Sequence, residues 1–116
     1  MLSSNIDVHV EVCCRKASFD LLPDVPVYLR IDLLEKVAPC QLKFSYETNL
    51  VDLEVIASFE ESIPTVEKCL LRKENPSLMV VYENEGRPEE FWEENLYVAL
   101  NSKREMRVHL RVAFPF

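Results

Sequence analysis

The chain has 116 residues, of which 48% are hydrophobic and 28% are charged, so it is expected to form one ordinary globular domain and not a two-domain enzyme. Its net charge of −7 argues against nucleic acid and anionic membranes as partners, because both are negatively charged themselves. Its one glycine, Gly86, excludes the glycine-rich phosphate loops of nucleotide-binding folds.

Apolar and polar residues alternate with a period of two along most of the chain, which predicts β-structure. In the N-terminal half this alternation predicts strands over residues 6–12, 27–33, 42–46 and 51–59. Pro23 and Pro26 flank Asp24 and predict a turn directly after the first of these strands. We expect the third and fourth strands, which a short polar break separates, to pair with each other in antiparallel fashion.

The C-terminal half continues the pattern, with an acidic loop in its middle. Its predicted strands cover residues 68–72, 78–82, 96–100 and 106–114, and the last has the clearest alternation. Residues 83–94 are acidic and contain Gly86 and Pro88, which predicts a long loop. We expect Phe91 and Trp92 to anchor this loop to the core.

About eight short strands, with turn signals roughly every ten residues, predict an all-β fold, an antiparallel two-sheet sandwich. The alternative is a ubiquitin-like α+β roll, in which residues 28–37 would form a helix across one sheet. The strict alternation in that window favours the sandwich. The whole chain, 1–116, is expected to be a single domain, N-terminal to or excised from a larger protein.

The spacing of the four cysteines fits neither a zinc site nor a disulfide between neighbours. We expect them to be free, buried thiols in a reducing, intracellular compartment. They are Cys13, Cys14, Cys40 and Cys69.

The residue types of a catalytic site do not occur in a recognisable arrangement. His9 and His109 fall on the polar sides of the first and last predicted strands and would face each other if those strands were neighbours. We expect them to be solvated side chains and not metal ligands. One glycine cannot form the nucleophile elbow of a serine hydrolase. We therefore predict no catalytic residue, no metal, no cofactor and no enzymatic activity.

Two charged surfaces are candidates for partner binding. The first is the acidic loop, where aromatic side chains flanked by carboxylates could dock a basic segment of a partner protein: Glu89, Glu90, Phe91, Trp92, Glu93 and Glu94. The alternative is a basic face on the last turn and the last strand: Lys103, Arg104, Arg107 and Arg111. The acidic loop and the basic face could also complement each other within the molecule.

The order of features in the C-terminal half resembles the C2-like third domain of calpains and calpain-related proteins. The residues that carry the resemblance are Leu53 to Pro64, Pro76 to Val81, Phe91 and Trp92, Leu96 to Leu100, and Val108 to Phe114. The resemblance implies an eight-stranded sandwich that serves as an adaptor in larger proteins, among them cytoskeletal and flagellar proteins. Calcium-binding C2 domains carry paired Asp-x-Asp loops, whereas the aspartates here stand singly, so a calcium site is not expected.

From these observations we expect a non-catalytic protein–protein interaction module of a cytoplasmic scaffold or cytoskeletal protein. The alternative function is a peripheral lipid- or calcium-binding C2 domain. The sequence leaves open whether the acidic loop or the basic face binds the partner.

Overall fold

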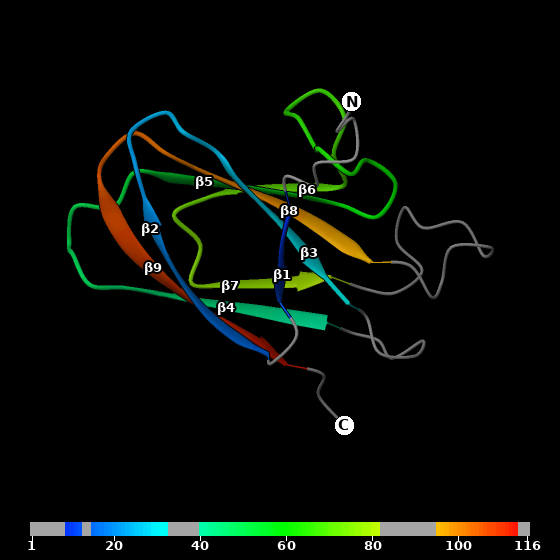
Figure 1. Ribbon diagram of the computed structural model, residues 1–116, viewed down its shortest axis with the longest axis horizontal. Helices are drawn as coiled ribbons and strands as arrows, with labels where there is room; N and C mark the ends of the chain where they lie inside the picture. Colours follow the sequence, from blue (N-terminus) through cyan, green and yellow to red (C-terminus); the bar gives the residue numbers. More distant parts are fainter. Residues whose placement is uncertain (1–8, 13–14, 33–39, 82–94, 114–116) are drawn as a thin grey trace, which may run out of the picture.

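The computed structural model describes residues 9–12, 15–32, 40–81 and 95–113. This part of the chain contains no helix, and its nine strands form two packed sheets (Figure 1). The strands are β1 (His9–Val12), β2 (Lys16–Leu21), β3 (Val27–Ile31), β4 (Cys40–Tyr46), β5 (Leu53–Ser58), β6 (Leu71–Glu74), β7 (Leu78–Val81), β8 (Leu96–Ser102) and β9 (Met106–Ala113).

The two sheets have their C-terminal strands near the centre. The first sheet has the order β1-β3-β8-β5-β6, and the second has the order β2-β9-β4-β7. The pairing of β1 with β3 is parallel, and the other strand pairs in the described residues are antiparallel. The connections β2–β3, β4–β5 and β8–β9 lie together at one end of the sandwich (Figure 1).

The core lies between the sheets because alternate residues of each strand point inward. In β9 the inward residues Met106, Val108, Leu110 and Val112 are buried, while the residues between them are exposed or half-buried. The first sheet contributes fully buried side chains from its inner strands β3, β5 and β8, among them Leu29, Val55, Val98 and Leu100. Burial of these two apolar faces is the main force that holds the sheets together.

The predicted all-β sandwich is confirmed, and so are most of its strands. The last predicted strand, 106–114, corresponds to β9, and the predicted strand 78–82 corresponds to β7. The window that the alternative roll would have made helical begins with strand β3, and residues 33–37 lie outside the described residues.

Two predictions about the strands are wrong, and one condition is not met. A strand, β2, lies between the first predicted strand and the proline-flanked turn. The predicted strands 42–46 and 51–59 do not pair with each other, because β4 belongs to the second sheet and β5 to the first. The condition under which His9 and His109 would face each other, that their strands are neighbours, is not met, because β1 and β9 also lie in different sheets.

His9 contacts two tyrosines of its own sheet and the connection between β5 and β6. Its ring packs at 6.5 Å against Tyr28 and at 5.3 Å against Tyr97, and its Nε2 lies 2.5 Å from the carbonyl oxygen of Ser62. Cys69 is free and half-buried, so the expected buried location is not met for this thiol. The side chains of the other three cysteines lie outside the described residues.

Tyr46 joins the end of β4 to the turn between β6 and β7. Its hydroxyl donates a hydrogen bond to the carbonyl oxygen of Pro76. Burial raises the pKa of Tyr46 to about 12, because the charged phenolate is poorly solvated there.

Replacing Tyr46 by Phe is expected to cost about 1 kcal/mol of unfolding free energy, because the hydrogen bond to Pro76 is lost. The raised pKa of Tyr46 also means that the folded protein retains a proton that the unfolded chain releases as the pH rises through 10. Stability should therefore fall from about pH 10 to about pH 12 in the wild type, and less steeply in Tyr46→Phe. Urea unfolding across this range measures both effects, and equal slopes would contradict the assignment.

Candidate functional site: the outer face of the second sheet

The outer face of the second sheet carries polar side chains in three successive rows across neighbouring strands. Strand register places Lys16 of β2 and Lys43 of β4 opposite Arg111 of β9. The next row contains Ser18, His109 and Ser45, and in the third row Asp20 lies opposite Arg107. The period-two alternation that buries the apolar residues of β9 directs all these side chains outward.

The first row, which we call the basic row, consists of Lys16, Arg111 and Lys43. All three residues are exposed. In the part of the chain that the structure describes, no ion pair or hydrogen bond involves any of these three side chains. Like charges directly opposite each other on adjacent strands repel, so this row destabilises the sheet. The face therefore carries uncompensated positive charge, although the protein as a whole has a net charge of −7.

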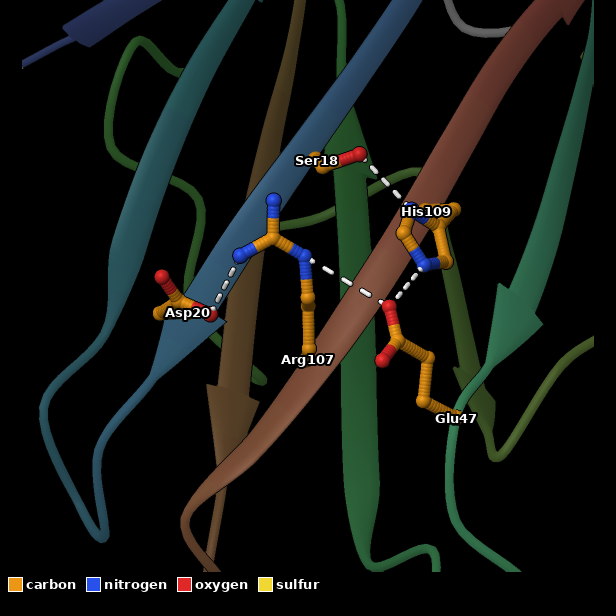
Figure 2. Close-up of polar contacts among 5 residues, drawn as sticks. All are labelled: Ser18, Asp20, Glu47, Arg107 and His109. Carbon is orange, nitrogen blue, oxygen red and sulfur yellow. Dashed lines mark hydrogen bonds and ion pairs between the residues drawn. The ribbon is translucent and has the colours of Figure 1, made fainter.

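The third row is compensated, in contrast to the basic row. Arg107 Nη1 lies 2.9 Å from Asp20 Oδ1, and Arg107 Nε lies 3.5 Å from Glu47 Oε2 (Figure 2). These exposed ion pairs contribute little to stability, about 0–1 kcal/mol each, but they neutralise the guanidinium. Arg107 and Arg111 share one strand and one face, and they differ in whether a carboxylate neutralises them.

The middle row holds an imidazole between a hydroxyl and a carboxylate. His109 Nδ1 lies 2.7 Å from Ser18 Oγ, and its Nε2 lies 2.5 Å from Glu47 Oε2 (Figure 2). A neutral ring satisfies both contacts if the Ser18 hydroxyl donates to Nδ1 and Nε2–H donates to Glu47. Ser45, on the other side of His109, has no hydrogen bond to a described residue.

A hollow of about 410 Å³ opens over the basic row and the middle row. The polar residues that line it are Lys16, Lys43, Arg111, Ser18, Ser45 and His109. Ammonium, guanidinium and hydroxyl groups are donors of hydrogen bonds, so the polar part of this lining suits an anion. The apolar residues Ala17, Phe44 and Leu110 complete the lining.

Hydroxyl, imidazole and carboxylate also follow one another in a catalytic triad. Here Ser18 and Glu47 are exposed, and the side chain of His109 retains 38% of its accessible surface. The backbone of β9 forms ladders with β2 and β4, so its amides beside His109 are not free to act as oxyanion donors. These features favour a binding role for Ser18 and His109. The lack of enzymatic activity stays a prediction.

The structure gives the four residues of the predicted basic face different surroundings. Arg111 lies in the basic row and Arg107 is neutralised. Lys103 lines a different hollow, of about 270 Å³, together with Asp52 and Glu54. Arg104 is exposed in the turn between β8 and β9.

Sequence reasoning missed Lys16 and Lys43 as site residues. Both occupy outward positions of short alternating runs, which is a signal that the sequence contains. Their proximity to Arg111 depends on the order β2-β9-β4, which alternation alone does not provide.

The acidic loop was the other predicted site. Glu89, Glu90, Phe91, Trp92, Glu93 and Glu94 lie outside the described residues. Their role in partner binding stays a prediction.

Two other hollows carry weaker arguments for a function. In the hollow beside Lys103, Arg72 is already paired with Glu54 at 2.5 Å. A hollow of about 400 Å³ at the β5–β6 connection is lined by three carboxylates: Glu60, Glu61 and Glu67. Within residues 9–12, 15–32, 40–81 and 95–113, no group of three or more potential metal ligands is assembled. The same residues include no helix that could cross a membrane.

Comparison with known proteins finds no family model that matches the chain and no matching curated protein. The candidate site therefore rests on its own geometry and charge.

Proposed function

We propose that the protein is a non-catalytic interaction module that binds an acidic segment of a partner protein on the outer face of its second sheet. The observation that carries the proposal is the basic row, Lys16, Arg111 and Lys43, which has no carboxylate partner among the described residues. Charge complementarity between such a row and an acidic segment gives fast encounter and fixes orientation.

The contrast between Arg111 and Arg107 supports this proposal. A strand face that served only as a solvated surface would gain stability from opposite charges on neighbouring strands, as Asp20 and Arg107 show two rows away from the basic row. Three cations side by side lack this stabilisation. An acidic ligand supplies it on binding, because its carboxylates take the place of the missing partners.

The wider context of the module is part of the same proposal. The C2-like resemblance of the C-terminal half supports an adaptor role in a cytoplasmic scaffold or cytoskeletal protein. A basic partner segment at the acidic loop stays a second prediction about the same module, since the two surfaces carry opposite charge.

Reversing the charge of Arg111 tests the proposal. A glutamate-rich peptide at low ionic strength should shift the amide resonances of β2, β4 and β9 in the wild type. Arg111→Glu should bind this peptide about tenfold more weakly or worse, because one attraction is lost and one repulsion is added. Added salt should weaken binding to the wild type, since exposed charges are screened.

Arg104→Glu is the matched control, because it changes the total charge equally but lies in the β8–β9 turn. Its affinity should stay within about twofold of the wild type. Arg111→Glu should remain folded, since its carboxylate can pair with Lys16 and Lys43, the residues opposite it. Equal peptide binding by Arg111→Glu and the wild type would refute the proposal.

A further inference from the structure

We propose that the hollow over the basic row recognises a phosphorylated side chain of the partner, so that phosphorylation of the partner switches binding on. This inference rests on the proposed function and deepens it, because it names the group that the acidic segment presents to the basic row.

The basic row has the geometry to surround one compact anion. Adjacent strands lie about 4.8 Å apart, so the backbones of Lys16 and Lys43 are about 10 Å apart, with that of Arg111 between them. Lysine and arginine side chains are long and flexible enough to converge over the central strand. All three line the same hollow.

The hydrogen-bond donors that line the hollow are more numerous than a single carboxylate can accept from. A carboxylate offers two oxygens and one negative charge, whereas a phosphorylated side chain offers three oxygens and a charge of about −1.5 to −2 at pH 7. The basic row alone supplies three cations. The hydroxyl of Ser45, which makes no hydrogen bond to a described residue, borders the same hollow. A phosphate satisfies this set of donors better than a single glutamate or aspartate does.

The neighbouring rows limit where the anion can sit. The third row, beyond His109, has two carboxylates, Asp20 and Glu47, around the single guanidinium of Arg107, so it keeps a net negative charge. On the other side of the basic row the register gives a neutral row, Ala113, Gln41 and Val80. A dianion is therefore attracted to the basic row and repelled by the third row, which fixes one position along the strands.

The same arrangement favours a peptide over a lipid surface as the source of the phosphate. A membrane would approach the whole outer face and bring its anionic headgroups against Asp20 and Glu47, both of which are exposed. A single side chain that projects from a peptide reaches the hollow without that repulsion.

Two synthetic peptides test the inference at physiological salt. One has glutamates around a central phosphoserine, and the other carries glutamate in place of the phosphoserine. We expect the phosphorylated peptide to bind the wild type at least about tenfold more tightly, because charge-assisted hydrogen bonds to the dianion are stronger and more numerous. Lys16→Gln, Lys43→Gln and Arg111→Gln should each reduce this preference. Arg104→Gln is the matched control, because Arg104 lies in the β8–β9 turn and does not line the hollow, and it should keep the preference.

The possible results separate the inference from the proposed function. Equal binding of both peptides would overturn phosphate recognition while leaving an acidic segment as the ligand. Failure of both peptides to bind, even at low salt, would overturn both proposals. Tighter binding to phosphatidylcholine vesicles that contain a phosphoinositide than to the phosphopeptide would overturn the inference in favour of a membrane ligand. A preference retained in Arg111→Gln would place the phosphate elsewhere.

Discussion

Replacing Leu100 by Ala is expected to lower the free energy of unfolding by about 2–5 kcal/mol, which is a large part of the stability of an ordinary domain. Leu100 is fully buried at 0% exposure in β8, between its register partners Val27 and Val55 on the neighbouring strands. The smaller side chain leaves a cavity that the packed sheets cannot close. Urea unfolding followed by far-ultraviolet circular dichroism measures the loss.

Leu50→Ala is the control for this substitution, because it removes the same atoms from a side chain that is 64% exposed. It should change the unfolding free energy by less than about 0.5 kcal/mol. If Leu100→Ala were no more destabilising than Leu50→Ala, the packing of β8 between its neighbours would be wrong.

Replacing Asn75 by Ala should be the second most destabilising change, at about 2–3 kcal/mol. Asn75 has a positive φ of 50°, and its Oδ1 accepts a hydrogen bond of 2.7 Å from the backbone N–H of Leu53. Its own N–H donates to the carbonyl oxygen of Leu53 at 2.7 Å. Asparagine tolerates the left-handed conformation better than alanine, and alanine also lacks the acceptor.

Two further variants separate these contributions in thermal and urea unfolding. Asn75→Gly keeps the left-handed conformation and loses the side-chain acceptor, so it should recover part of the loss. Asn49→Ala changes an exposed asparagine and should be nearly neutral. If Asn75→Ala were as mild as Asn49→Ala, the bridge to Leu53 would not support the fold.

Alternation in the sequence predicts which side of a strand is buried, and it does so well where apolar residues are large. In β9 every second residue is a large apolar one, so both the strand and its buried face could be predicted. In β2 the inward positions are Ala17, Phe19 and Leu21, and the small side chain of Ala17 weakens the alternation. The prolines that follow β2 predict a turn and no strand. The strand was missed for that reason.

Pairing between strands is a property of distant segments, and local alternation does not determine it. The short break between β4 and β5 suggested a hairpin, yet the chain crosses there from one sheet to the other. The candidate site also depends on pairing between strands that are distant in the sequence. Lys16 and Arg111 are 95 positions apart in the sequence and meet only because β2 and β9 are neighbours.

The central position of the last two strands has a consequence for the order in which the protein can fold during synthesis. β8 lies between β3 and β5, and β9 lies between β2 and β4. Neither sheet can therefore assemble completely before these two strands have left the ribosome. Until then the apolar faces of β3 and β4 have no central strand beside them. Such non-local pairing makes folding slow, on the millisecond to second scale, and leaves the nascent chain open to aggregation. Chaperone protection during translation is therefore of greater value to this protein than to a helical domain of equal length.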